Sequence, residues 1–235
     1  MKIEILFPAF ANLYGEKVGI QYFAQCLPDA EFINTELTDT PAFASDDVDM
    51  IFMGSMTESQ QELVIEKLMP YRDRINALIE KGVVFLIVGN ALEIFCKYID
   101  TGDKKIPALG IFEEYAVRNM DKRYHSLIMG KMENFKIIGF KAQFSHLYGD
   151  NSNEYLYEVI RGDGIHPGAK YEGLRRGNFL GTYTIGPLLL LNPDFTKYIF
   201  SLLGVPETEL KFAECIRKAY DIRLKEFEKP ETIYM

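Results

Sequence analysis

The apolar run Val83–Val88, which lies between Gly82 and Gly89, constrains this chain more than any other feature of its sequence. The run has no polar residue at alternate positions, which is typical of a strand buried on both faces. Such strands occur in parallel sheets that helices cover on both sides. A helix is predicted at Ala91–Tyr98, so the chain has to turn sharply from strand to helix at Gly89. The run therefore predicts an α/β fold with a tight turn at this strand's end.

Other segments continue the alternation of strands and helices. Strands are predicted at Lys2–Phe7, Ala30–Asn34, Asp49–Met53 and Phe179–Thr184. Helices are predicted at Glu16–Cys26, Ser59–Lys81 with a break near Pro70, Asp194–Leu203 and Glu207–Phe227. The middle of the chain, Tyr115–Tyr157, is richer in short extended segments. We expect a single domain over 1–235, with a C-terminal helical extension over about 206–235.

Charge and composition exclude several classes of protein. The 235 residues carry 26 Lys and Arg against 34 Asp and Glu, a net charge of −8, which argues against nucleic acid as a partner. No apolar run approaches the roughly 18 residues that a membrane helix requires. Three cysteines and three histidines give neither a disulfide framework nor a zinc pattern, so no metal and no cofactor are expected. The first residues do not read as a signal peptide, which predicts a cytoplasmic protein.

Four segments keep a specific order and spacing. They are LFPAFANLYGEKVGI (Leu6–Ile20), DMIFMGSMTESQQELV (Asp49–Val64), KGVVFLIVGNALEIFCKYI (Lys81–Ile99) and YEGLRRGNFLGTYTIGPLLLLNPDF (Tyr171–Phe195). Together they resemble the class I glutamine amidotransferases of the cobyric acid synthase type, and among these the glutaminase subunits of lipid II isoglutaminyl synthases. The resemblance implies a three-layer, flavodoxin-like fold with a mostly parallel central sheet. It also implies a role in cell wall or cofactor biosynthesis.

The resemblance also identifies the catalytic positions, and both are changed. The family places a nucleophilic cysteine on the strand-to-helix turn, where this chain has Gly89. It places a histidine base after Gly-Thr-Tyr-x, where this chain has Ile185. The turn that helps to build the family's oxyanion hole keeps Gly54 but has Ser55 and then a methionine where the family has more glycine. Glutaminase chemistry is therefore predicted to be absent, and the chain is not expected to be a glutaminase.

Four further residues are candidates for the former pocket. Asn90, Glu93 and Tyr183 would line it if the fold holds, although Glu93 could instead form a salt bridge on the helix surface. His146 lies in a region where the family often has a histidine near the pocket, but it could equally be a structural or surface residue. Cys96, about 10 Å along the predicted helix from Gly89, is too far to replace the nucleophile.

Three functions remain open at this stage. The first is a non-catalytic partner or regulatory subunit of a Mur-ligase-like synthetase, which the resemblance implies as the partner. The second is an enzyme of altered hydrolase or transferase chemistry that uses Glu93, His146 or Asn90. The third is a sensor that binds a glutamine-like small molecule without hydrolysing it.

Overall fold

A computed structural model describes residues 1–234 and is built around a six-stranded sheet. Its strands are β1 (Lys2–Leu6), β2 (Glu31–Thr35), β3 (Met50–Met53), β4 (Val84–Val88), β13 (Leu174–Arg176) and β14 (Phe179–Thr182), in the spatial order β2-β1-β3-β4-β14-β13. Every neighbouring pair is parallel except β13 and β14, which are antiparallel. The predicted α/β class is confirmed.

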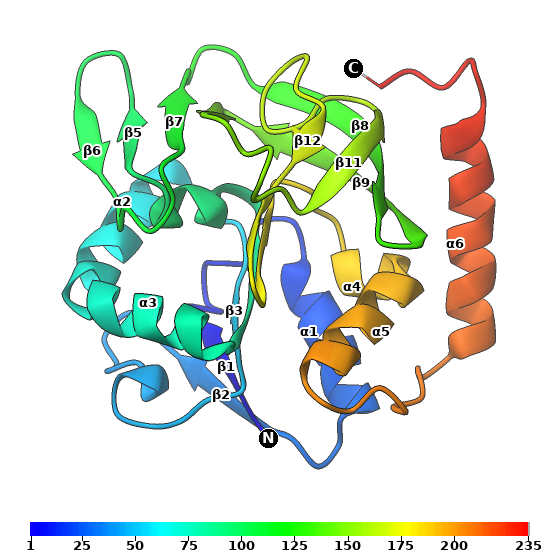
Figure 1. Ribbon diagram of the computed structural model, residues 1–235, viewed down its shortest axis with the longest axis horizontal. Coiled ribbons are helices and arrows are strands. Elements are labelled where there is room, and N and C mark those ends of the chain that lie inside the picture. The colour runs from blue at the N-terminus through cyan, green and yellow to red at the C-terminus, as the bar shows by residue number, and fades with distance from the viewer. Residues whose placement is uncertain (235) are drawn as a thin grey trace.

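Helices cover both faces of this sheet, which explains why β4 has no polar face (Figure 1). One face packs on α1 (Glu16–Cys26), α4 (Leu188–Leu191) and α5 (Pro193–Leu202). The other packs on α2 (Glu58–Leu68) and α3 (Arg72–Lys81). Leu86 and Val88 belong to the first core, whereas Phe85 and Ile87 belong to the second. Successive side chains of a strand point to opposite faces, so each residue of β4 is buried against a helix.

Two short 3-10 helices lie in the connections on the α2 side. They are η1 (Ala42–Ala44), between β2 and β3, and η2 (Met69–Tyr71), between α2 and α3. The predicted break near Pro70 is confirmed, because Pro70 lies in η2, where a proline cannot donate the backbone hydrogen bond that a continuous helix needs. Two helices in tandem result.

Two small sheets lie over the carboxyl ends of the central strands (Figure 1). The first, sheet B, is mixed and contains β5 (Tyr98–Asp100), β6 (Lys105–Pro107), β7 (Tyr115–Arg118) and β10 (Ser145–Tyr148). The second, sheet C, is antiparallel and contains β8 (Tyr124–Met132), β9 (Phe135–Gln143), β11 (Tyr157–Arg161) and β12 (Tyr171–Glu172). The extended character expected for the middle of the chain corresponds to these sheets.

The helix predicted at Ala91–Tyr98 is wrong in type and extent. A 3-10 helix, η3 (Gly89–Phe95), takes its place, and Tyr98 begins β5. The carbonyls of Ile94 and Phe95 accept hydrogen bonds from Leu109 and Ile111 at 2.9 and 3.0 Å, so they are not available to continue a helix. Contacts with a distant loop therefore override the local helical preference.

The helix predicted at Glu207–Phe227 begins later, as α6 (Ala213–Glu228). Phe212, immediately before it, has φ of +53°, which interrupts a right-handed helix. The backbone of Lys211 is held by α1 instead, because its carbonyl accepts a 3.0 Å hydrogen bond from the Tyr22 hydroxyl. Helix α6 packs on sheet C through Tyr220 and Phe227.

Within residues 1–234, no helix is both long and apolar enough to cross a membrane. The single-domain boundary over 1–235 stays a prediction.

Candidate functional site

The carboxyl ends of β3, β4 and β14 bring the predicted site residues together. The register pairs Met53 with Ile87 and Thr182 with Val88, so these three strands end at the same edge of the sheet. The chain after each strand therefore meets the others: Gly54 and Ser55, then Gly89 and Asn90, then Tyr183–Ile185. In open α/β sheets this edge is where ligands bind.

Gly89 is enclosed by the two other turns. Its φ is +69°, a conformation that a side-chain-bearing residue rarely adopts. A Cβ atom added to Gly89 would lie 2.5 Å from Cβ of Ser55 and 3.4 Å from Cγ2 of Ile185. The positions that the resemblance assigns to the nucleophile and the base are thus adjacent in space. The side chains of Ser55 and Ile185 are therefore the groups nearest to the place that a side chain at Gly89 would take.

The turn after β3 packs closely against the first loop and against Glu16. Gly54 allows this turn to pass close to the first loop, since a Cβ there would lie 2.3 Å from the carbonyl oxygen of Ala11. The Ser55 N–H, the donor that an oxyanion hole would require, points 3.3 Å to Oε1 of Glu16, and the Ser55 hydroxyl donates to the same atom. Glu16 is buried in the first turn of α1. Both donor groups of Ser55 are therefore directed to the same carboxyl oxygen.

Asn90 fixes the same turn from the opposite side. Its Oδ1 accepts a 3.0 Å hydrogen bond from the Met56 N–H, and its Nδ2 donates to the Met56 carbonyl at 2.7 Å. The Met56 side chain is buried in the core on the α2 side, so Ser55 and not Met56 obstructs the approach to Gly89. The side-chain amide of Asn90 therefore holds the backbone of Met56 through both its oxygen and its nitrogen.

The remaining cavity is too small for an amino acid. It has a volume of about 30 Å³ and is lined by Gly89, Ser55, Asn90 and Tyr183, among others. Ligand pockets measure about 300–1,000 Å³, whereas a single water needs about 10–15 Å³. The guanidinium of Arg123, which also lines the cavity, lies 5.7 Å from the Tyr14 ring centre and 5.3 Å from that of Phe144. Arg123, Tyr14 and Phe144 thus form one side of the cavity, with Arg123 exposed at the surface.

Glu93 is fully buried beneath the turn and does not line the cavity. The Tyr183 hydroxyl donates to its Oε1 at 3.0 Å, and Nε2 of Gln61 donates to its Oε2 at 3.0 Å. Burial raises the pKa of Glu93 to about 7, while Gln61, Arg118 and Tyr183 oppose the rise. The alternative of a surface salt bridge is wrong, because this carboxyl group is enclosed in a polar network. Tyr183 links this carboxyl group to the cavity, since Tyr183 lines the cavity and donates its hydroxyl to Glu93.

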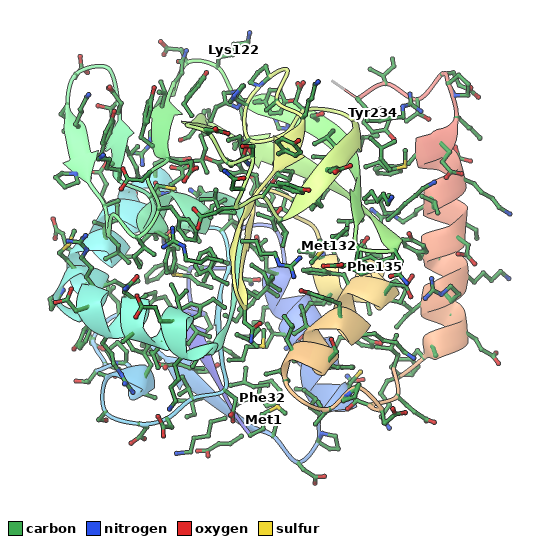
Figure 2. The ribbon with its side chains drawn as sticks, viewed as in Figure 1. Met1, Phe32, Lys122, Met132, Phe135 and Tyr234 are labelled. Carbon is green, nitrogen blue, oxygen red and sulfur yellow. The ribbon has the colours of Figure 1, made fainter. Side chains whose placement is uncertain are left out.

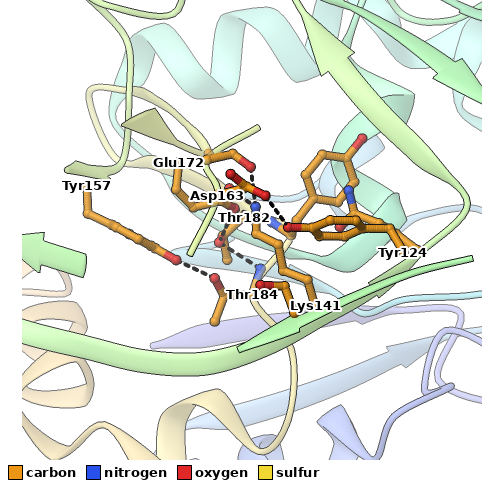
Figure 3. A network of polar contacts seen from close by, with 12 residues as sticks. Tyr124, Lys141, Tyr157, Asp163, Glu172, Thr182 and Thr184 are labelled. Atoms are coloured by element: carbon orange, nitrogen blue, oxygen red, sulfur yellow. Dashed lines mark hydrogen bonds and ion pairs between the residues drawn. The ribbon is translucent and has the colours of Figure 1, made fainter. Parts of the chain in front are cut away.

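A second buried network contacts the backbone of Tyr183, and Figure 3 shows its members Lys141, Glu172 and Thr182. Lys141 and Glu172 are both fully buried and form an ion pair. The other carboxylate oxygen of Glu172 accepts from the Thr182 hydroxyl at 3.0 Å and from the Tyr183 N–H at 2.8 Å. Tyr183 is thereby fixed at both its backbone and its hydroxyl. Lys141 also donates to the Gly164 carbonyl, so the network joins β9, the loop before β12 and the end of β14.

His146 and Cys96 are not brought to the cavity. His146 lies on β10, half-buried and packed edge to face on Tyr124 at 4.9 Å between ring centres. Burial lowers the pKa of His146 to about 4, so its ring is neutral at physiological pH. Cys96 is buried just after η3, where burial raises the pKa of its thiol. Within the described part of the chain, no group of three or more His, Cys, Asp or Glu side chains could hold a metal.

Sequence reasoning missed the buried residues that hold this site. They are Glu16, Gln61, Arg118, Lys141 and Glu172. Three of them, Glu16, Gln61 and Glu172, lie inside segments that carry the family resemblance. A charged or amide residue in a segment otherwise destined for the core is a signal that could have identified them.

One solved structure and two related proteins are similar to this chain. A ThuA-like protein from Parabacteroides merdae, a solved structure, covers 88% of each chain at 12% identity with a TM-score of 0.37, which is too low to assign a fold. The GatD subunit of lipid II isoglutaminyl synthase (glutamine-hydrolyzing) from Staphylococcus aureus is 27% identical over 165 residues, 70% of this chain and 67% of its own. The corresponding GatD subunit of Streptococcus pneumoniae is 25% identical over 201 residues, 83% of this chain and 76% of its own.

The family model of the CobB/CobQ-like glutamine amidotransferase domain matches residues 6–192, which include all three turns around Gly89. A match over most of the chain is a stronger statement than either pairwise identity. This chain belongs to the CobB/CobQ-like glutamine amidotransferase family.

Proposed function

We propose that this chain is a degenerate member of its family that does not hydrolyse glutamine and acts as a non-catalytic partner or regulatory subunit. The contact between Gly89, Ser55 and Ile185 carries the proposal. Glutamine hydrolysis by this family needs a nucleophile and a base, and neither glycine nor isoleucine can attack an amide or transfer a proton. A substituent on Gly89 would meet Ser55 before it met a substrate.

The surroundings of the turn support the same proposal. The Ser55 N–H is directed to Glu16, and the remaining cavity of about 30 Å³ is closed by Arg123 with its two aromatic neighbours. A site under selection for hydrolysis would keep its anion-binding donors free and its pocket open. In this chain, buried polar networks instead fix the turns of the former site in one conformation.

The partner that we propose is a Mur-ligase-like synthetase in cell wall or cofactor biosynthesis. The two GatD relatives are named as subunits of lipid II isoglutaminyl synthase, and a docking surface can outlast the chemistry that it once served. For the fold, we propose the three-layer, flavodoxin-like arrangement. The strand order β2-β1-β3-β4-β14 supports it, since this is the order of flavodoxin-like sheets.

The two other functions have less support. An enzyme of altered chemistry would need Glu93, His146 or Asn90 to meet a substrate. Glu93 and His146 do not line the cavity beside Gly89, and Asn90, which does, has its side-chain amide bonded to the backbone of Met56. A sensor of a glutamine-like molecule would need a cavity several times larger than about 30 Å³. Both would require the stacked Arg123 to move away first.

The proposal is tested by combining this chain with a Mur-ligase-like synthetase from the same organism. We expect a stable complex in size-exclusion chromatography with light scattering, and no rise in the melting temperature of this chain with added glutamine. A saturable thermal shift with glutamine would favour the sensor. A chain that stays alone at micromolar concentrations of both proteins would contradict the partner role.

A further inference from the structure

The outer edge of β2 presents unpaired backbone groups. The Glu31 N–H donates to the Met1 carbonyl at 2.9 Å, and the Thr35 carbonyl accepts from the Phe7 N–H at 2.7 Å. In a parallel pair, alternate residues bond to the same neighbour, so the backbone groups of Phe32 and Asn34 point away from β1. Because β2 is the last strand of the sheet, these groups have no strand partner within residues 1–234.

This edge lacks the features that usually block pairing. Proteins protect exposed edges with proline, inward-pointing charge, bulges or very short strands. Strand β2, with the sequence EFINT, is five residues long, pairs with β1 without a register shift and contains no proline. Its only charge is on Glu31, at its first position. The strand is therefore suited to accept another strand.

A hollow of about 240 Å³ lies beside this edge, between β2 and α1. Its walls are mostly apolar and include Ile20 and Ala24 of α1 and Phe52 of β3. The side chains of Phe32 and Asn34 also line it, and Figure 2 shows Phe32 beside Met1 at one margin of the molecule. The two residues with outward-facing backbone groups thus also supply side chains to the hollow. A strand paired with β2 would place a side chain of its own over this opening.

The rim of the hollow carries one uncompensated cation. Lys17, in the first turns of α1, lines the hollow and is exposed. It takes part in no ion pair within residues 1–234, although the chain as a whole has a net charge of −8. A free cation beside an apolar hollow is complementary to an acidic group that neighbours an apolar side chain.

We propose that the β2 edge binds an extended segment of a partner polypeptide by strand addition. The segment pairs its backbone with Phe32 and Asn34, inserts one large apolar side chain into the hollow and sets an acidic side chain against Lys17. None of the residues that line the hollow lines the cavity beside Gly89. The inference therefore stands whether or not the former active site is inactive.

The test uses a displayed library of random heptapeptides, selected on the full chain. We expect enriched peptides that carry an acidic residue close to a large apolar one. In anisotropy titrations, Asn34→Pro removes one outward N–H and should weaken their binding about five- to tenfold. Ala24→Phe fills the hollow and should weaken peptide binding at least about tenfold. Lys17→Gln should weaken it about threefold and reduce its dependence on salt.

Matched controls on α6 separate these effects from general changes of the surface. Lys218→Gln and Ala219→Phe change exposed residues of the same types on another helix and should leave peptide binding unaltered. Circular dichroism melting checks that each variant folds, and Ala24→Phe remains informative if Asn34→Pro does not fold. No enrichment on the wild-type chain would overturn the proposal. Enriched peptides that bind all the β2 and hollow variants as tightly as the wild type would also overturn it.

Discussion

A methyl group added at Gly89 should destabilise this protein far more than the same change at an open glycine. In Gly89→Ala the new residue keeps φ near +69°, which costs about 1–2 kcal/mol for a residue with a Cβ. Its Cβ would also lie 2.5 Å from Cβ of Ser55, so one of the two turns has to shift. Overpacking of this kind costs about 1–3 kcal/mol. The sum predicts a loss of about 2–5 kcal/mol in the free energy of unfolding.

Gly177→Ala is the matched control for this change. Gly177 also has a positive φ, +56°, but nothing lies within 4 Å of its added Cβ. Its substitution should therefore cost only the backbone contribution of about 1–2 kcal/mol. The difference between the two variants isolates the contact with Ser55.

Urea denaturation of both variants, and of Ser55→Gly with and without Gly89→Ala, gives the coupling between the two turns. Because Ser55→Gly removes the obstructing Cβ, we expect it to recover about 1–3 kcal/mol of the Gly89→Ala loss. The reasoning is refuted if Gly89→Ala costs no more than Gly177→Ala, or if the two substitutions at the site are additive. Additivity would mean that Ser55 does not occupy the nucleophile's space.

Three further predictions concern the buried networks and the sheet edge. The pKa of Glu93 is raised from 4.5 to about 7, so the folded protein binds more protons than the unfolded chain between these pH values. The contribution of Glu93 to the free energy of unfolding, about 3 kcal/mol, is therefore present below pH 4.5 and lost as the pH rises to 7. The stability of the wild type relative to Glu93→Gln should fall over this range in urea titrations at each pH, and a constant difference would contradict the raised pKa. Lys141→Met leaves the Glu172 carboxylate buried without its partner and should cost about 3–5 kcal/mol, a loss that Glu172→Gln should partly restore if the charge is the cause. Ile33→Pro removes a hydrogen bond to β1 and should lower the melting temperature by several degrees, whereas Asn34→Pro should leave the melting temperature nearly unchanged. Equal effects of the two variants would show that the register between β1 and β2 is wrong.

Local sequence patterns predicted five of the six strands of the central sheet and missed β13. Strands β3 and β4 are short apolar runs between turn residues, β1 alternates polar and apolar residues, and a break at Pro70 follows from the geometry of proline. The patterns failed where contacts between distant segments determine the local secondary structure. The segment after Gly89 is a 3-10 helix because backbone groups of the Leu109–Phe112 loop bond to its last carbonyls.

For the two small sheets, the sequence predicted extended segments but not the individual strands or their pairing, for a similar reason. Strands β5, β6 and β12 have only two or three residues each, too few to show an alternating pattern. Their pairing is set by partners far along the chain, as when β5 pairs with β7 in parallel. Such pairings leave almost no local trace in the sequence.

The candidate site divides in the same way. The family resemblance singled out Gly89 and Ile185, and the structure brings these two residues together. The residues that seal the site could not be derived from spacing, because Glu16, Arg123 and Phe144 come from three separate segments. Only the folded arrangement shows that the Glu16 carboxyl group meets the Ser55 N–H and that Arg123 lines the cavity.

The most direct test of the central claim is glutamate and ammonia release from glutamine by the purified chain, alone and combined with a Mur-ligase-like synthetase. We predict that release does not exceed that of a heat-denatured control, since Gly89 offers no thiol and Ile185 no base. The variant Ser55→Gly, Gly89→Cys, Ile185→His, which supplies both groups and the space for them, provides the comparison. Saturable release by the wild-type chain would contradict the account.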